Sequence, residues 1–184
     1  MPLWSAHMES AIKRSGSAAI TAGTLPWTRS CFVCGEQNPH GLRLKSRIEN
    51  GRVVLDYTTR DADLGYRHIV HGGILMTLLD EVMTWAAIVA AERMCVAAEL
   101  TVRLKKPVKV GQALRAEGWI TNGKARLIMA DGHIIDAARQ VLATATGKYV
   151  AMPRGESALC AGDFVISPDA IHPERLLRAG DAAS

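Results

Sequence analysis

The chain has 184 residues, 48% of them hydrophobic, which is enough for one substantial core but too short for two ordinary domains. The net charge of +4 and the pI near 9.0 suit an anionic ligand such as a nucleotide phosphate, although many proteins that bind nothing acidic share such an excess. Four cysteines without a secretory signal predict a cytoplasmic protein, and charges interrupt the longest apolar run, so we expect no membrane span.

The two ends of the chain are expected to lie outside the main fold. Residues 1–30 show little periodicity, which predicts an N-terminal arm that is a frayed helix or disordered. After Met152 the chain becomes polar, so residues 153–184 are expected to form a tail with a short helix between Ser167 and Leu177. The folded domain is therefore expected at residues 31–152.

Cys31-Phe32-Val33-Cys34 is a Cys-x-x-Cys motif, which is compatible with zinc binding or with thiol redox chemistry. A structural zinc site needs further ligands; His40 is a candidate, while Cys95 and Cys160 stand alone. The strand-to-helix context of a redox motif is missing. We therefore expect a turn packed against the sheet, with no metal and no cofactor.

The strands predicted from the sequence are antiparallel neighbours. Asn50-Gly51 separates two strand-like runs, which is a strong hairpin signal. Alternation between apolar and polar residues after position 95 predicts four core-facing residues, Ala98, Leu100, Val102 and Leu104. Six strands are expected, at Leu42–Ile48, Arg52–Thr58, Val96–Lys105, Ala113–Thr121, Leu127–Asp136 and Gln140–Val150.

A long helix is predicted at Ile74–Ala91, which lacks Pro and Gly and is rich in Leu, Met and Ala. Its apolar stripe consists of Leu75, Leu78, Leu79, Val82, Trp85, Ala86 and Val89. Residues off the stripe are apolar too, so the helix should be buried nearly all round. The expected architecture is α+β, an antiparallel sheet of six strands wrapped around one helix.

Asp80 and Glu81 are unexpected in this helix, since an unpaired interior carboxylate costs roughly several kcal/mol. Glycines at a helix N-terminus, here Gly72 and Gly73, leave backbone N–H groups that a ligand can approach. Such donors and an internal carboxylate are what ester or thioester cleavage needs. Gly72 and Asp80 are separated by roughly 12 Å within one helix, so we expect a symmetry partner to supply the second group.

His71-Gly72-Gly73, with an acid nine residues after the histidine, resembles the hotdog-fold acyl-CoA thioesterases of the phenylacetate-degradation (PaaI-like) type. The likeness runs from Cys31 to Met152, about two thirds of the chain, and includes Asn38-Pro39-His40-Gly41-Leu42, Lys106-Pro107 and Ala145-Thr146-Gly147-Lys148. The resemblance implies a hotdog fold, an acyl-CoA substrate hydrolysed to a carboxylic acid and CoA, and a homo-oligomer, either a dimer or a dimer of dimers (a homotetramer).

The resemblance also implies roles for individual residues. Asp80 takes the position of the base or nucleophile, and the Gly72 N–H that of the donor to the thioester carbonyl. His71 would orient the loop without transferring protons, and Gly73, beside Gly72 at the helix N-terminus, completes the predicted catalytic set.

The sequence departs from the family pattern in two places. Ala97 and Ala98 stand where many relatives have Ser or Thr, and Gly65 stands where some have Asn. Thr84, Glu81 or Thr101 would then replace the missing groups.

The phosphates of an acyl-CoA would need cations, and basic residues gather at two strand ends. The candidates are Arg103, Lys105, Lys106 and Lys109 at one end and Lys124 and Arg126 at the next. A solvated rim is an equally good interpretation, since strand ends are usually charged.

Two other functions stay open. A non-catalytic acyl-CoA-binding or sensing protein on the same fold would explain the missing hydroxyl and Asn, but it would not need Asp80. Gly35-Glu36-Gln37-Asn38-Pro39-His40 imperfectly resembles the active-site pattern of hotdog enoyl-CoA hydratases, with Glu36 in place of Asp; we interpret it as a capping turn. The N-terminal arm is too short for a DNA-binding domain, so no nucleic-acid partner is expected.

Overall fold

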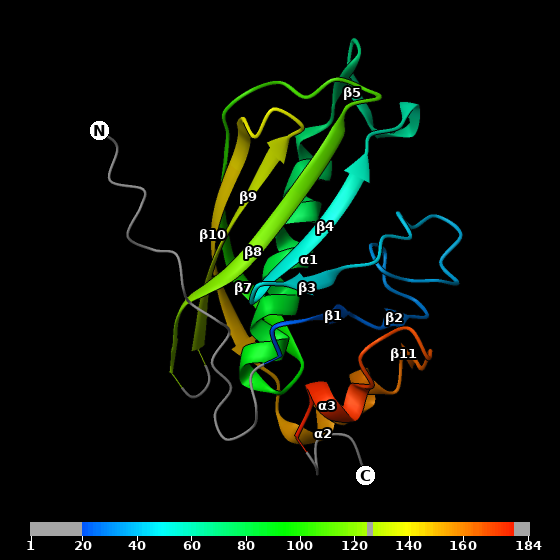
Figure 1. Ribbon diagram of the computed structural model, residues 1–184, viewed down its shortest axis with the longest axis vertical. Helices are drawn as coiled ribbons and strands as arrows, with labels where there is room; N and C mark the ends of the chain where they lie inside the picture. The colour runs from blue at the N-terminus through cyan, green and yellow to red at the C-terminus, as the bar shows by residue number, and fades with distance from the viewer. Residues whose placement is uncertain (1–19, 125–126, 179–184) are drawn as a thin grey trace.

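The computed structural model of the chain describes residues 20–124 and 127–178. An antiparallel sheet curls around one long helix, α1 (Gly72–Ala91), as Figure 1 shows. Within these ranges the sheet has seven strands in the order β1-β3-β4-β8-β9-β10-β7. They are β1 (Ala22–Thr24), β3 (Arg47–Glu49), β4 (Arg52–Thr58), β7 (Cys95–Leu104), β8 (Ala113–Lys124), β9 (Leu127–Asp136) and β10 (Val141–Ala151).

The strand count differs by one from the six that we predicted. The additional strand, β1, comes from the predicted N-terminal arm and pairs with β3. The predicted strand Leu42–Ile48 is wrong except for its last residues, which belong to β3. Arg43 has a φ of 53°, a left-handed conformation that breaks a strand, and the Leu42 N–H donates instead to the Phe32 carbonyl at 2.8 Å.

The predicted hairpin between β3 and β4 is confirmed. Asn50 and Gly51 both have positive φ, 49° and 71°, as a two-residue type I′ turn requires. The predicted strand Leu127–Asp136 is also confirmed: it is β9, which runs without a break through Asp131-Gly132.

The helix α1 fills the inside of the sheet and contacts β4, β7, β8, β9 and β10. All seven residues of the predicted apolar stripe are buried. Their burial removes most of the helix surface from water, which is the main source of its stability. By length and composition this helix could also cross a membrane, but over half of it is buried within the protein.

The strand β7 lies at the edge of the sheet and has β10 as its one neighbour among the described strands. Val96 and Leu104 remain 46% and 47% exposed. Leu104 faces α1 as predicted, since it lies against Gly72, but Leu104 and Ala98 are both exposed because no other described strand covers this edge. Leu100 and Val102 do pack partly against the core.

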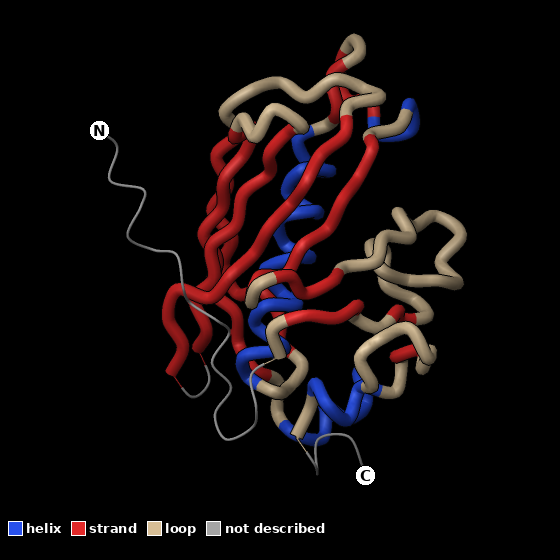
Figure 2. Tube along the Cα trace, viewed as in Figure 1, coloured by secondary structure: helices blue, strands red, loops and turns tan. Residues whose placement is uncertain are grey.

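The segments beyond the predicted domain pack beside and below the lower part of α1 in Figure 2. They form β2 (Trp27–Thr28), α2 (Arg154–Ala161), β11 (Phe164–Val165) and α3 (Pro173–Leu176), and β2 pairs with β11. Phe164, Leu176 and Leu177 are buried in the core. The predicted helix of the tail starts later than Ser167, at Pro173, with His172 as its N-cap. Residues 1–19 and 179–184 of the predicted arm and tail lie outside the described residues.

Candidate functional site

The N-terminus of α1 is fixed by a short loop that ends at His71. The chain approaches through a 3₁₀ turn (Asp61–Asp63) and the small hairpin of β5 (Leu64–Tyr66) and β6 (Ile69–Val70). His71 is the N-cap, and its Nδ1 accepts a hydrogen bond of 3.0 Å from the Gly73 N–H. The Gly72 N–H has no acceptor within the described part of the chain, so it is the donor that a ligand can use.

Asp63 fixes this loop through hydrogen bonds of its side chain and its backbone. It is 2% exposed, and its carboxylate accepts hydrogen bonds from the Tyr57 hydroxyl, the Arg60 N–H at 2.7 Å and the Arg60 guanidinium at 3.1 Å. Burial alone would raise the pKa of Asp63, but the bonds from Tyr57 and Arg60 outweigh it and lower that pKa. Its backbone carbonyl then accepts the His71 N–H at 2.8 Å. No sequence pattern marked Asp63, because its partners meet only in the folded loop.

Gly65 is required by the same loop. A Cβ at this position would lie 2.8 Å from the Cα of His71 and 3.0 Å from its backbone nitrogen. Any side chain at position 65 would collide with the His71 backbone, so the loop needs glycine here.

A cleft of about 310 Å³ opens beside Gly72. Its lining is mostly apolar, with Lys105 and Lys106 at the rim. The lining residues are Ile69, Val70, Gly72, Leu75, Leu104, Lys105, Lys106, Pro107 and Val108. Leu104 lies closest to Gly72, since a Cβ there would be 2.8 Å from Leu104 Cδ1. The cleft can accept an apolar group next to a backbone donor.

Asp80 lies two turns further along α1 and is half-buried. Its Oδ1 accepts hydrogen bonds from the Tyr149 hydroxyl at 3.1 Å and from Thr84 Oγ1 at 3.3 Å. Burial and the neighbouring Asp80 raise the pKa of Tyr149, so its hydroxyl stays protonated and acts as the donor. A carboxylate held in this way is a candidate base or nucleophile.

Tyr149 is the site residue that the sequence analysis missed. It is fully buried on β10, and a Cβ at Gly147 would lie 2.7 Å from its ring. Residues two apart in a strand share a face, so the glycine makes room for the ring. The signal in the sequence was Gly147, a glycine two positions before Tyr149 in a predicted strand, which indicates that the tyrosine ring packs over the glycine.

Glu81 turns to a different environment from that of Asp80. Its Oε1 accepts a hydrogen bond of 2.8 Å from Trp85 Nε1, and burial raises its pKa to about 7. A carboxylate oxygen of Glu81 and the sulfurs of Cys31 and Cys34 lie within 4.8 Å of one another. A hydrogen bond from Cys34 lowers the pKa of Cys31 to about 6. Glu81 therefore takes no part in the hydrogen bonding that holds the Asp80 carboxylate.

Of the three residues expected to replace missing groups, Thr84 alone is bonded to Asp80. Thr101 is exposed on β7 and lines a cleft on the outer face of the sheet. Ala97 lies opposite Tyr149 in the pairing of β7 with β10. The hydroxyl groups that contact Asp80 come from α1 and β10 and not from this part of β7.

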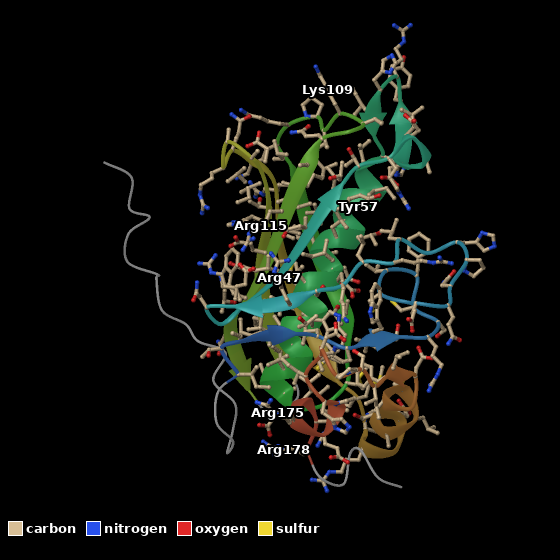
Figure 3. All side chains as sticks on the ribbon, turned by 45° about the vertical axis from the view of Figure 1, so that its right-hand side comes forward. Arg47, Tyr57, Lys109, Arg115, Arg175 and Arg178 are labelled. Carbon is tan, nitrogen blue, oxygen red and sulfur yellow. The ribbon has the colours of Figure 1, made fainter. Side chains whose placement is uncertain are left out.

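The predicted CoA-binding cations do not form one group. Lys105 and Lys106 lie at the cleft beside Gly72, and Lys109 lies at the same end of the molecule, as Figure 3 shows. Arg103 lines the outer cleft together with Lys105, Trp119 and His133, so Lys105 lies at the edge of both clefts. Lys124 ends β8, and Arg126 lies outside the described residues.

The segment Gly35–His40 forms a turn in which Glu36 and His40 are both exposed. The Asn38 side chain accepts a hydrogen bond of 3.0 Å from the His40 N–H and donates one of 3.0 Å to the Ser30 carbonyl. This is the arrangement of a capping turn.

Comparisons with known proteins agree with this architecture. Residues 68–143 match the family model described as thioesterase superfamily. Among solved structures, the thioesterase superfamily protein RHA08564 is 26% identical, with a TM-score of 0.60 over 66% of this chain and 63% of that chain. The PaaI protein of the E. coli phenylacetic acid degradation operon is 23% identical, with a TM-score of 0.55 over 60% of this chain and 78% of that chain.

A Streptococcus mutans UA159 protein, solved with bound acetyl-CoA, is 22% identical, with a TM-score of 0.53 over 55% of this chain and 82% of that chain. No curated protein matches the sequence. The predicted hotdog fold is confirmed by these likenesses, with seven strands in place of six.

Proposed function

We propose that this chain, a hotdog-fold member of the thioesterase superfamily, hydrolyses an acyl-CoA thioester to a carboxylic acid and CoA. The observation that carries the proposal is the Asp80 carboxylate on α1, which is half-buried and held by the hydroxyls of Tyr149 and Thr84. A protein that only bound the ligand would gain nothing from keeping such a carboxylate inside an apolar helix.

In the proposed reaction the Gly72 N–H donates a hydrogen bond to the thioester carbonyl oxygen, where negative charge develops. Asp80 removes a proton from a water molecule that attacks the carbonyl carbon, or attacks that carbon itself to form an acyl–Asp80 anhydride, which water then hydrolyses to the carboxylic acid and free Asp80. In both routes the carbon–sulfur bond breaks, and the CoA thiolate takes up a proton. The dipole of α1 favours the developing negative charge at Gly72.

Both groups reach one carbonyl only if they come from two chains, because roughly 12 Å of helix separates them within one. The exposed edge of β7, with Val96 and Leu104, supports this assembly. A second copy that pairs along β7 would extend the sheet and cover these side chains.

The substrate class is supported by the cleft beside Gly72, which has an apolar lining and two lysines at its rim. An acyl chain suits the apolar part, and the phosphates of CoA suit Lys105 and Lys106. The acetyl-CoA bound by the similar S. mutans protein supports the same class of ligand.

The test is the release of free thiol from a panel of acyl-CoA esters that differ in chain length and aromaticity, with Asp80→Asn as the matched inactive variant. We expect at least one ester to be cleaved by the wild type and not by the variant. Binding of several esters without thiol release by the wild type would instead identify an acyl-CoA-binding or sensing protein.

A further inference from the structure

Two segments that are far apart in the sequence place three metal-binding side chains together. Cys31 and Cys34 lie on the turn before β3, and Glu81 lies on α1. Their sulfur and carboxylate oxygen atoms are all within 4.8 Å of one another. Cys34 and Glu81 are buried and Cys31 is half-buried. The proposed hydrolysis uses none of the three.

The turn at Cys31 is built to present both sulfurs on one side. The Val33 N–H points to Cys31 Sγ at 3.3 Å, and the Gly35 N–H donates to the Cys31 carbonyl at 2.9 Å. A Cβ at Gly35 would lie 2.1 Å from that carbonyl oxygen, so this tight turn needs glycine. Backbone N–H groups aimed at a sulfur stabilise a thiolate, the form in which cysteine binds metals.

The other two candidate ligands, Cys34 and Glu81, are oriented by side chains outside the cluster. Thr28 Oγ1 lies 3.6 Å from Cys34 Sγ. Trp85 Nε1 donates to Glu81 Oε1 at 2.8 Å, and the Trp85 ring stacks on Phe164 with centroids 5.7 Å apart. Such contacts fix the orientation of metal ligands in known sites, and here they come from three separate elements.

We propose that Cys31, Cys34 and Glu81 bind one Zn²⁺ ion that ties the N-terminal turn to the central helix. Two sulfurs and one carboxylate oxygen are zinc ligands, and a tetrahedral ion with zinc–sulfur bonds of about 2.3 Å holds its sulfurs about 3.8 Å apart. A water molecule on the accessible side of Cys31 completes the four ligands. His40, the third ligand considered from the sequence, is exposed, and Glu81 takes that position instead.

A bound metal would explain why Cys31, Cys34 and Glu81 lie together, whereas a disulfide would explain only the two cysteines. A disulfide would leave the Glu81 carboxylate buried, with the Trp85 indole as its hydrogen-bond donor. In the zinc site the ion balances the charge of that carboxylate and of both thiolates. The site lies one residue from Asp80, but it makes no contact with the reacting groups, so its role is structural.

The experiment measures the metal content of the full chain, purified without chelators or a polyhistidine tag, by elemental mass spectrometry. We expect one zinc per chain. Replacement by Co²⁺ should give a near-ultraviolet sulfur-to-cobalt charge-transfer band and the visible bands of tetrahedral cobalt. In Cys34→Ser and Glu81→Gln the zinc content should fall at least tenfold, while the matched control Cys160→Ser and the variant His40→Ala should keep it.

A second measurement uses wild-type protein and does not depend on the folding of any variant. Titration with an organomercurial should release the zinc to a chromophoric chelator after about two thiols have reacted. Absence of zinc and failure to take up Co²⁺ would overturn the proposal, as would a metal-free protein in which peptide mapping finds a Cys31–Cys34 disulfide. Zinc retained in Glu81→Gln at the wild-type level would also overturn it. None of these results depends on thioesterase activity.

Discussion

The hydroxyl of Tyr149 on β10 donates a hydrogen bond of 3.1 Å to Oδ1 of Asp80 on α1. Thr84, one turn further along α1, gives the same oxygen a second bond of 3.3 Å. The carboxylate is therefore fixed by the sheet on one side and by its own helix on the other. Oδ2 accepts no hydrogen bond from the described residues, so it is the oxygen we expect to meet the attacking water.

The first prediction concerns Asp80→Asn. We expect a folded protein in which kcat for the best acyl-CoA ester falls roughly 10²–10⁴-fold, the loss typical of removing a positioned base. Thiol release measures the rate, and circular dichroism checks the fold. Glu99→Gln, which changes an exposed carboxylate on β7, is the matched control and should stay active. Near-normal rates in Asp80→Asn together with an inactive Glu81→Gln would move the role to Glu81.

The second prediction concerns Tyr149→Phe, which keeps the ring and removes the hydroxyl. A hydrogen bond to a charged group contributes about 1.5–3 kcal/mol, so we expect kcat to fall roughly 10- to 100-fold while KM changes little. Tyr66→Phe, at a tyrosine that is 72% exposed, serves as the control. An unchanged kcat in Tyr149→Phe would mean that Thr84 alone positions the carboxylate.

The third prediction tests whether two chains share a site. Valine at position 72 would collide with Leu104 and block the donor. If Gly72 and Asp80 act from different chains, a dimer that pairs Asp80→Asn with Gly72→Val keeps one intact site of two. A random equal mixture should then show about one quarter of the wild-type activity, although each variant alone is inactive.

The control for this mixture replaces Gly72→Val with Gly155→Val, which has open space around it and should stay active by itself. A fully active monomer in sedimentation velocity experiments would contradict the shared site. So would a mixture of the two inactive variants that gains no activity after subunit exchange.

Local sequence signals predicted the parts of the fold that depend on neighbours in the chain. The stripe of α1 and the Asn50-Gly51 turn follow from side-chain period and backbone preference, and both are present. The bond from Tyr149 to Asp80 joins residues 69 positions apart, and no local pattern encodes it. Glu81 likewise drew attention as a buried acid, but only the fold brings it to the two cysteines.

The same limit explains the errors in the sheet. Leu42–Ile48 has an extended pattern, yet the left-handed conformation of Arg43 lets the chain turn toward residues 32–34. Leu104 alternates as a core residue should, but β7 ends as an open edge in the single chain. Alternation predicts which face a residue is on and not whether another element covers that face.

The fourth prediction concerns pH and the outer face of the sheet, where Arg47 and Arg115 lie together in Figure 3. The nearby His133, then Arg115 and Arg52, lower the pKa of Glu117 from 4.5 to about 2. This depression stabilises the folded state fully above pH 4.5, by roughly 3 kcal/mol at 1.36 kcal/mol per pH unit, and the gain is lost as the pH falls from 4.5 to 2.

Glu117→Gln should therefore be less stable than the wild type at pH 7, and the difference should shrink between pH 4.5 and pH 2. Urea unfolding at a series of pH values measures it. Glu99→Gln, at an exposed carboxylate, should show little difference at any pH. A stability difference for Glu117→Gln that is constant from pH 7 to pH 2 would show that Glu117 acts through its shape and neutral hydrogen bonds alone.

The fifth prediction concerns Lys105 and Lys106 beside the Gly72 cleft. Their backbone N–H groups donate to the Leu142 carbonyl at 2.8 Å and 3.1 Å, which fixes the segment against β10 and leaves both side chains exposed. If they bind CoA phosphates, Lys106→Ala should raise KM for a CoA ester several-fold more than KM for a short thioester without the nucleotide. Lys148→Ala, whose ammonium group pairs with Glu99 at 2.7 Å, is the control and should change neither value.

Salt gives an independent measure of the same contact, because exposed charges are screened over a Debye length of roughly 8 Å at physiological ionic strength. For the wild type, KM for the CoA ester should rise with salt while KM for the short thioester stays nearly constant. In Lys106→Ala the rise should be smaller, since one of the screened contacts is already gone. If KM for both substrates responds identically to salt and to the substitution, these lysines do not recognise the nucleotide, and the net charge of +4 serves solubility instead.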